Sequence, residues 1–455
     1  MSDNNHYSNK SILKMIIVLA IPAVIENFFQ TILGFVDTFF VAQIGINEVT
    51  AVGVSNAILA IYFAVFMSIG ISTNVFIAKY NGAKEYEKAE KMAQQSIILS
   101  IITGLIFGVI TLIFAELLLR LMGIEDTVLE QGVLYFKIVA IPSVLISLMF
   151  GLSSILRGTK DTKTPMKVTI LINIINIILD YVLIFGFWFI PSLGIAGAAW
   201  ATVIARLIGV IILFYHVKKS SVGSKINFTN WSWDKELQKE LIQLGTPAMA
   251  ERLAMRIGQV LYFGFIVKLG TETFAAHQIA GNIEIFSYMI GYGFATAATT
   301  LVGEMIGSKQ YEFAKKTAYY STALGVGFMS IFGLFLFLFG EWTATFFTND
   351  NEVIQQIAIA LKIDAFIQPI LAVVLILTGV FQGAENSKYP LYLTTIGIWL
   401  IRTVGVYVLG IWLGMGIAGI WIAIGLDNLF RAVLLFRKIH KNQWINKNRI
   451  KLSLE

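Results

Sequence analysis

Long runs of apolar residues, each separated from the next by a short polar segment, recur along the whole chain. The runs reach about twenty residues, the length that an α-helix needs to cross a bilayer. Twelve membrane-spanning helices are predicted, at residues 13–40, 50–78, 94–119, 128–154, 165–188, 195–217, 240–266, 275–304, 315–340, 353–380, 390–412 and 416–436. The pattern therefore predicts an all-α polytopic membrane protein.

The two halves of this pattern repeat each other at a constant offset of 225 residues. Pro22 is matched by Pro247, and Glu26 by Glu251. Further matched pairs are Gly45 and Gly270, Lys84 and Lys309, Gly158 and Gly383, Pro165 and Pro390, and, after a small change in length, Leu193–Gly197 and Met415–Gly419. Each half holds six spans, so both halves should have the same orientation, related by a pseudo-two-fold axis along the membrane normal.

This repeat divides the chain into an N-lobe at residues 1–217, a cytoplasmic linker at 218–239, and a C-lobe with a cytoplasmic tail at 240–455. Of 34 lysine and arginine residues, 25 fall at the termini or in loops after even-numbered spans, against four on the other side. By the positive-inside rule both termini are expected in the cytoplasm, with the protein in the cell membrane. The net charge of +6 thus reflects topology and gives no reason to expect a nucleic-acid partner.

The composition excludes several kinds of catalytic and metal-binding site. The chain is 57% hydrophobic and 14% charged, and it has no cysteine and four scattered histidines. These features exclude disulfides and cysteine metal sites, and no P-loop motif for ATP is present. We therefore expect no catalytic residues and no resident cofactor. Nothing in the sequence indicates an obligate protein partner, and the lipid bilayer is the expected surrounding.

Four polar residues of the N-lobe are predicted to meet in the outer half of the membrane. They are Asp37, Asn176, Asp180 and Thr202, on three different spans. Asn176 and Asp180 are four residues apart and therefore share a helix face. Carboxylate, amide and hydroxyl oxygens suit a hard cation or a shared proton. The alternative is that Asn176, Asp180 and Thr202 only form hydrogen bonds between helices.

Carboxylates of the C-lobe are the second set of candidates. Glu251 and Asp364 are both expected near the middle of the membrane, where a buried carboxylate can exchange a proton near neutral pH. For Glu284 and Asp427, a structural ion pair with an arginine is the expected role. Arg252 and Arg256 share a helix face and are candidates to neutralise Glu251 or Glu284. Three other arginines lie on or near span ends, where they are expected to reach toward water: Arg206, Arg402 and Arg431.

Glu26 and Asp37 lie on the same predicted helix, about 16 Å apart on one face. Glu26 is matched by Glu251 in the second repeat, whereas the residue that corresponds to Asp37 is Tyr262. That asymmetry makes Asp37 the better candidate for ion coupling, and assigns Glu26 to the shared scaffold or to a central cavity. Residues considered for a substrate cavity are Glu26, Tyr262, Gln278, Glu284 and Tyr288, and kinks are expected at Pro22, Pro142, Pro247 and Pro369.

Several motifs resemble the multidrug and toxic compound extrusion (MATE) transporters. They are the stretches at 22–27, 36–45, 156–165, 176–180, 194–198, 275–279 and 381–386, spread over both lobes. The resemblance implies export of cationic or amphiphilic organic compounds by alternating access, coupled to Na⁺ or H⁺. It also implies that Asp37, Asn176, Asp180 and Thr202 form a cation or proton site, and that Glu251 and Asp364 correspond to C-lobe carboxylates of NorM-like members.

Three other functions remain open at this point. A flippase of the related lipid-linked saccharide exporters would need a basic cavity for a pyrophosphate, and the central groups here are mainly acidic. A major-facilitator carrier also has six plus six spans, but the loop at 81–88 lacks the usual Gly/Asp/Arg pattern of that family. An intramembrane enzyme would need a metal cluster or a nucleophile with its base.

Overall fold

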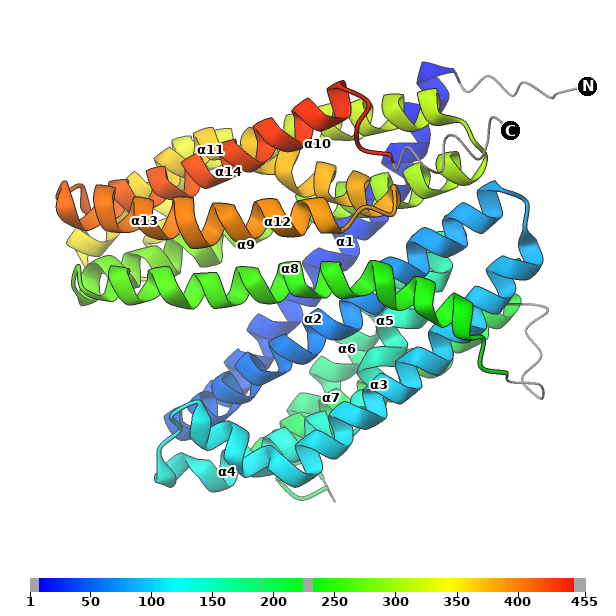
Figure 1. Ribbon diagram of the computed structural model, residues 1–455. Coiled ribbons are helices and arrows are strands. Elements are labelled where there is room, and N and C mark those ends of the chain that lie inside the picture. The colour runs from blue at the N-terminus through cyan, green and yellow to red at the C-terminus, as the bar shows by residue number, and fades with distance from the viewer. Residues whose placement is uncertain (1–7, 189, 224–231, 446–455) are drawn as a thin grey trace, which may run out of the picture. The chain divides into compact units, whose positions relative to one another are not determined.

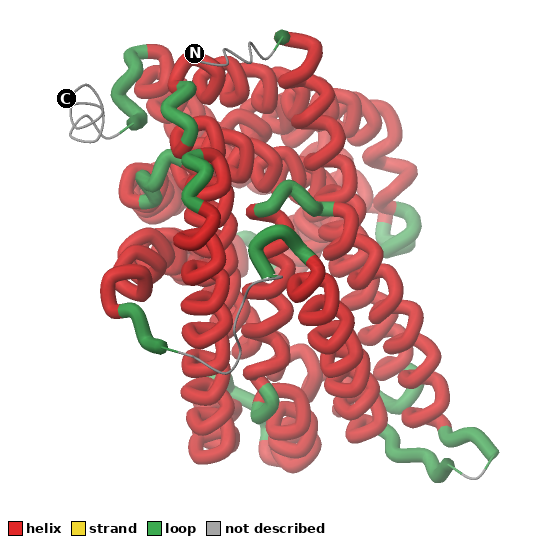
Figure 2. Tube along the Cα trace, turned by 90° about the vertical axis from the view of Figure 1, so that its right-hand side faces the viewer, coloured by secondary structure: helices red, strands yellow, loops and turns green. Residues whose placement is uncertain are grey.

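A computed structural model describes residues 8–188, 190–223 and 232–445, and these residues form helices joined by short loops (Figures 1 and 2). Within them the single departure from helix and loop is an isolated bridge between Phe187 and Ile190. The helices are α1 (Asn9–Ala42), α2 (Ile46–Gly82), α3 (Tyr86–Leu121), α4 (Asp126–Ala140), α5 (Ser143–Gly158), α6 (Lys163–Phe185), α7 (Ile195–Lys219), α8 (Lys235–Val267), α9 (Thr271–Gly307), α10 (Tyr311–Ala344), α11 (Asn351–Gly383), α12 (Lys388–Ile396), η1 (Gly397–Arg402), α13 (Thr403–Gly405), η2 (Val406–Trp412) and α14 (Gly416–His440).

The predicted all-α membrane architecture is confirmed. Ten helices of the described chain are long and apolar enough to cross a bilayer, counting Lys388–Trp412 as one. The predicted span at 128–154 is the pair α4 and α5, which bends by 43° next to Pro142. The remaining predicted span, at 240–266, is α8, which is 33 residues long and carries Glu251, Arg252 and Arg256. In contrast to Pro142, Pro22, Pro247 and Pro369 lie inside helices that continue through them.

Two compact units make up the fold. The N-terminal unit is Ile25–Met249, and the C-terminal unit combines the chain up to Val24 with Ala250–Glu455. One boundary falls inside α1 and the other inside α8, so the first helix of each repeat belongs partly to each unit. The expected division at 217 and 240 follows the repeat in the sequence, whereas the units follow packing. Residues 224–231 of the expected linker and the tail beyond Ile445 lie outside the described residues.

Apolar packing explains why the start of α1 belongs to the C-terminal unit and the start of α8 to the N-terminal unit. Ile12, Ile16 and Leu19 are buried in the C-terminal unit, in one cluster with residues of α9, α10, α11 and α14. Leu241 and Leu244 are buried in the N-terminal unit, in one cluster with residues of α2, α3, α5, α6 and α7. Within a bilayer such clusters hold helices together mainly by close van der Waals packing.

The repeat seen in the sequence extends to the backbone. Lys84 and Lys309 have φ of 60° and 59°, each in the turn that follows its helix. Lys160 and Glu385, also 225 residues apart, have φ of 67° and 58°. Left-handed backbone is uncommon outside glycine, so its recurrence at matched positions shows that the two halves share turn geometry as well as span order.

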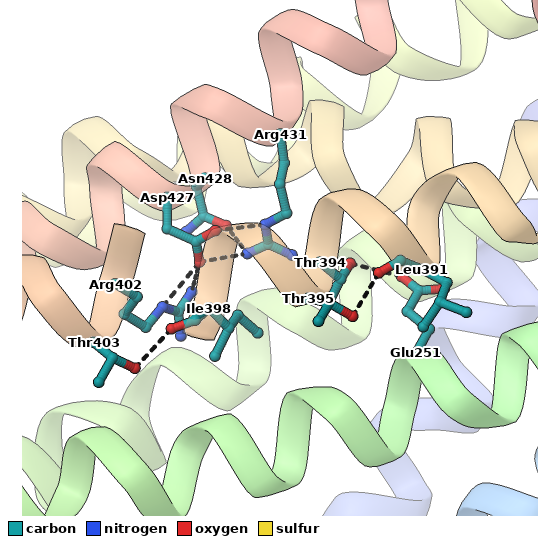
Figure 3. Close-up of polar contacts among 10 residues, drawn as sticks. All are labelled: Glu251, Leu391, Thr394, Thr395, Ile398, Arg402, Thr403, Asp427, Asn428 and Arg431. Carbon is teal, nitrogen blue, oxygen red and sulfur yellow. Dashed lines mark hydrogen bonds and ion pairs between the residues drawn. The ribbon is translucent and has the colours of Figure 1, made fainter. Parts of the chain in front are cut away.

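One span departs from its repeat partner. In the N-terminal unit α6 is a regular α-helix, but the matching segment 388–412 contains the two π-helical stretches η1 and η2. Thr403 Oγ1 donates to the carbonyl of Ile398, five residues earlier, at 2.8 Å, as the wider π turn allows (Figure 3). Short π-helical segments occur frequently at functional sites, because they displace side chains from the regular helical register.

Candidate functional site

The four predicted N-lobe residues do come together in the N-terminal unit. Asp37 lies on α1, Asn176 and Asp180 lie one turn apart on α6, and Thr202 lies on α7. Helices α6 and α7 pack side by side, and Asn176, Asp180 and Thr202 are all buried. The i, i+4 spacing on α6 therefore aims two polar side chains at the same neighbours, as predicted.

The Asn176 amide links Asp37 to α7. With the amide oriented to satisfy both neighbours, its nitrogen donates to Asp37 Oδ1 at 2.9 Å and its oxygen accepts from the Thr202 backbone N–H at 3.3 Å. The Asp37 and Asp180 side chains also lie within electrostatic range of each other. Two carboxyl groups can share a hydrogen bond only if one of them holds a proton. The arrangement can thus hold a proton between two carboxylates.

Two further residues face this cluster and were missed in the sequence. Tyr135 on α4 is buried within electrostatic range of Asp37 and Asp180. Arg206 on α7 interacts with Asp37 and Tyr135. The prediction that Arg206 reaches toward water is wrong, because its side chain turns inward to the acidic pair. A signal was present: Arg206 follows Thr202 by four residues and so lies on the same helix face.

Hydrogen bonding in this cluster is incomplete. Asp180 Oδ2 and Arg206 Nη1 are buried atoms without a hydrogen-bonding partner among the described residues. Most buried polar atoms have a hydrogen-bonding partner, so a buried carboxylate oxygen without one can accept a ligand. Two carboxylates, an amide oxygen and a hydroxyl are oxygen ligands of the type that a hard cation prefers.

Glu26 lies on the same helix as Asp37 but has a different role. Its Oε1 accepts from Arg157 Nη2 on α5 at 2.5 Å, and the glutamate is 1% exposed. In the second repeat the matching residue is Glu251, but Gln382 stands at the position of Arg157. The charged pair therefore occurs in the first repeat alone, and the assignment of Glu26 to a shared scaffold or to a central cavity stays a prediction.

Glu251 in the C-terminal unit makes a weaker set of contacts. Its Oε1 accepts from Thr394 Oγ1 on α12 at 3.1 Å (Figure 3). Arg252 and, at greater range, Arg431 contribute positive potential. The prediction that Arg252 helps to neutralise Glu251 is thus consistent with the structure, although no ion pair between them is recorded among the described residues.

Asp427 on α14 is the centre of a buried cluster of charges. Its Oδ1 accepts from Arg431 Nε at 2.9 Å, and its Oδ2 accepts from Arg402 Nε and from Arg431 Nη2, both at 2.9 Å (Figure 3). Arg402 Nη2 also lies 2.7 Å from Oδ2. Arg431 Nη2 also donates to Asn428 Oδ1 at 2.8 Å. The ion pair predicted for Asp427 is therefore present. The prediction that Arg402 and Arg431 reach toward water is wrong, because Asp427 holds both of them inside the unit, where they are 8% and 6% exposed.

Local backbone makes room for this cluster. A side chain at Gly397, the first residue of η1, would place its Cβ 2.0 Å from Asp427 Oδ1. Only glycine lets the carboxylate approach so closely. Arg402 is the last residue of η1, and its guanidinium lies over the ring of Tyr262 at 5.5 Å from the centroid. The η1 stretch thus supplies both the glycine that makes room for Asp427 and Arg402, one of the two arginines that pair with it.

Asp364 lies on α11 and is fully buried. Its Oδ2 accepts from Gln368 Nε2 at 2.6 Å, whereas its Oδ1 has no partner among the described residues. The carboxylate that interacts with it electrostatically is Glu284 on α9, not Glu251. Glu284 is 8% exposed, and its Oε1 also lacks a hydrogen bond within the described chain. The ion pair expected for Glu284 is not among the recorded ones, although Arg402 lies within electrostatic range.

The remaining cavity candidates are spread over different environments. Tyr262 is 4% exposed and belongs to an apolar cluster of α8, α9, α10, α11, η2 and α14. Tyr288 is partly buried on α9 and interacts with Glu284 and Arg402. Gln278, on the same helix, is exposed. Their assignment to a substrate cavity stays a prediction.

Comparison with known proteins agrees with the repeat. The MatE family profile matches the chain twice, at residues 22–182 and 247–408. A "Probable multidrug resistance protein NorM" from Thermotoga maritima is 31% identical over 434 residues, which cover 95% of this chain and 93% of that protein. The "Uncharacterized transporter YisQ" of Bacillus subtilis is 29% identical and covers 94% of each chain.

Solved structures show the same fold. A structure titled "Outward-facing conformation of a multidrug resistance MATE family transporter of the MOP superfamily" superimposes with a TM-score of 0.89 at 24% identity, covering 95% of this chain and 96% of the other. A MOP superfamily transporter from Pyrococcus furiosus, whose title reports reverse polarity of its binding pocket, gives a TM-score of 0.88 with the same identity and coverage. With the repeated profile and the relative from Thermotoga, these findings show that the chain belongs to the MatE family and is a multi-pass membrane transporter of the multidrug and toxic compound extrusion type.

Proposed function

We propose that this protein is an antiporter that exports cationic or amphiphilic organic compounds, driven by inward movement of Na⁺ or H⁺. The observation that carries the proposal is the cluster of Asp37, Asn176, Asp180 and Thr202, with a buried carboxylate oxygen that has no partner among the described residues. Loading this cluster with a cation removes a buried negative charge. It therefore changes the relative stability of conformations that pack α1, α6 and α7 differently.

The names of several relatives support the substrate class. The relative from Thermotoga maritima is named as a probable multidrug resistance protein, and the Pseudomonas aeruginosa relative PmpM, 25% identical, is named as a multidrug resistance protein. For this chain we infer a cell membrane location with both termini in the cytoplasm, from the distribution of lysine and arginine. No bound cofactor other than the coupling ion enters the proposal.

A flippase of lipid-linked saccharides is less well supported. A pyrophosphate group would need free arginines or lysines at the centre of the protein. Arg402 and Arg431, the buried arginines of the C-terminal unit, are already engaged by Asp427, and Arg157 is engaged by Glu26. These cations have carboxylate partners, so they do not form an obvious anion site.

Transport in reconstituted vesicles tests the proposal. The purified protein is placed in liposomes, and movement of a fluorescent organic cation such as ethidium is followed while a Na⁺ gradient or a pH gradient is imposed separately. One of the two gradients should drive transport. Asp37→Asn should slow it by at least about tenfold, the change that 1.4 kcal/mol of lost ion binding would produce.

Asp126→Asn is the matched control, because Asp126 is an exposed carboxylate on α4 that pairs with Arg120. This variant should transport at the rate of the unmodified protein. If Asp37→Asn and Asp364→Asn both retain the full rate, the assignment of the coupling residues is wrong. If neither gradient drives any organic cation, the antiporter proposal itself fails.

A further inference from the structure

Arg206 places a positive charge near Asp37, one of the two carboxylates of the cluster in the N-terminal unit. It lies one turn after Thr202 on α7 and interacts electrostatically with Asp37 and Tyr135. Its Nη1 is buried and has no hydrogen-bonding partner among the described residues. A charge in this position changes how many ions the pair of carboxylates needs.

The charge balance of the cluster can be counted directly. Among the described residues, the ionisable groups that interact here are Asp37, Asp180, Arg206 and the phenol of Tyr135. With both carboxylates ionised and the phenol neutral, two negative charges face one positive charge. The cluster then has a net charge of −1, and one monovalent cation makes it neutral.

A proton in place of a metal ion gives the same count. A proton shared by Asp37 and Asp180 leaves one negative charge on the pair, which Arg206 balances. Without the arginine, the same pair would need two monovalent cations to reach neutrality. Buried charge that is not balanced is strongly unfavourable, so the number of bound ions should follow the charge balance.

We propose that Arg206 is a positioning residue that limits the N-terminal carboxylate site to a single monovalent cation. The guanidinium balances one carboxylate by proximity, and Asp180 Oδ2 remains free to bind the ion. The inference rests on the proposed antiport function, and it adds a stoichiometry: one Na⁺ or one H⁺ is exchanged at this site in each cycle.

Counting bound cations on the purified protein in nanodiscs tests the proposal. Binding of ²²Na⁺ is measured by equilibrium dialysis, and proton uptake is measured with a pH dye in Na⁺-free buffer, so the two ions are distinguished. Arg206→Gln should bind one cation more than the unmodified protein. Arg206→Lys, which keeps the charge, should bind the same number, as should Arg120→Gln, which removes an exposed arginine of α3.

A second pair of variants protects the test against misfolding of Arg206→Gln. Asp180→Asn alone leaves one carboxylate and one arginine, a neutral cluster, so it should bind one cation fewer than the unmodified protein. Adding Arg206→Gln to Asp180→Asn restores the net charge of −1 and should restore the lost cation. An arginine that only supports packing would not give this rescue.

The outcomes are separable from those of the proposed function. An unchanged cation count in Arg206→Gln, or a double variant that binds no more than Asp180→Asn, overturns the role of Arg206. Gradient-driven transport that Asp37→Asn abolishes would still uphold the antiporter. Conversely, if Asp37→Asn leaves the cation count of the unmodified protein unchanged, the carboxylate pair is not an ion site and both conclusions fall.

Discussion

Each unit of this transporter contains a buried cluster of an acid with arginine, and the two clusters are built in opposite ways. In the N-terminal unit two acids, Asp37 and Asp180, face one arginine, Arg206. In the C-terminal unit one acid, Asp427, is held between the arginines Arg402 and Arg431. The first cluster leaves a carboxylate oxygen and a guanidinium nitrogen without partners in the described chain, whereas both oxygens of Asp427 accept hydrogen bonds.

This difference separates a structural cluster from one that is available to an ion. A carboxylate whose oxygens are all occupied has little to offer a ligand, and removing it leaves buried cations exposed to a low dielectric. A carboxylate with an unoccupied oxygen can gain a partner. Leu193–Gly197 and Met415–Gly419 are related by an offset of 222 residues. At this offset Arg206 corresponds to Asn428, so one unit has an arginine where the other has an amide.

Asp427→Asn should produce the largest loss of stability. Arg402 and Arg431 would both remain buried without their carboxylate, and breaking a buried pair in this way costs about 3–5 kcal/mol. The expected result is a much lower thermal unfolding temperature in detergent, measured by intrinsic tryptophan fluorescence. Asp126→Asn, at an exposed pair with Arg120, should leave the unfolding temperature almost unchanged, because exposed ion pairs contribute little to stability. Equal unfolding temperatures for the two variants would mean that the Asp427 cluster does not hold the unit together.

Glu26→Gln should have an intermediate effect. It removes the carboxylate from the partly exposed Arg157, at a cost of roughly 2 kcal/mol in unfolding free energy. The double variant Glu26→Gln/Arg157→Gln should recover part of that loss, because no unpaired charge remains. The second repeat already carries a glutamine, Gln382, at the position that matches Arg157. Additive losses in the double variant would contradict a direct pair.

Thr394→Val should cost less. It removes one hydrogen bond to Glu251 while it preserves shape, so about 1 kcal/mol of stability is expected to be lost. Thr395→Val is the matched control, because its hydroxyl donates to the carbonyl of Leu391 within the same helix. If chemical unfolding gives the same midpoint for both variants, Thr394 contributes nothing particular to Glu251.

Asp180→Asn should change stability least, by less than about 0.5 kcal/mol, because the amide can donate a hydrogen bond to Asp37 and it removes repulsion between two acids. Transport should nevertheless fall strongly. Thermal unfolding and vesicle transport measured on the same preparation would check this. A large loss of stability together with lost transport would place Asp180 with Asp427 among structural charges and remove the contrast between the units.

Much of the architecture was predictable because apolar runs of membrane length are a strong signal. The matches of Pro22 with Pro247 and of Glu26 with Glu251 also predicted the repeat, which the backbone of Lys84 and Lys309 supports. The i, i+4 spacing of Asn176 and Asp180 predicted their common face correctly. These features depend on local periodicity, which the sequence displays directly.

Other features depend on packing that the sequence does not display. The arginines at 206, 402 and 431 lie in apolar spans, and whether such a side chain turns inward or toward water is decided by carboxylates on other helices. The π-helical stretches were equally hidden, because residues 397–412 read as an ordinary apolar run. Gly397 lies close to Asp427, and this contact gives a physical reason for η1. It is visible only in the assembled structure, because the two residues lie on different helices.

The division of α1 between the two units has a consequence for biosynthesis. The N-terminal unit is one uninterrupted segment, but it ends at Met249, beyond the first repeat, so a nascent chain must enter the second repeat before this unit is complete. The side chains of Ile12 and Ile16 are made before the whole N-terminal unit, yet they pack with helices that emerge only after Ala250. Synthesis of the N-terminal unit is therefore complete before that of the C-terminal unit, although part of the C-terminal unit precedes it in the chain. The first half of α1 can pack with its helices only after they have been made.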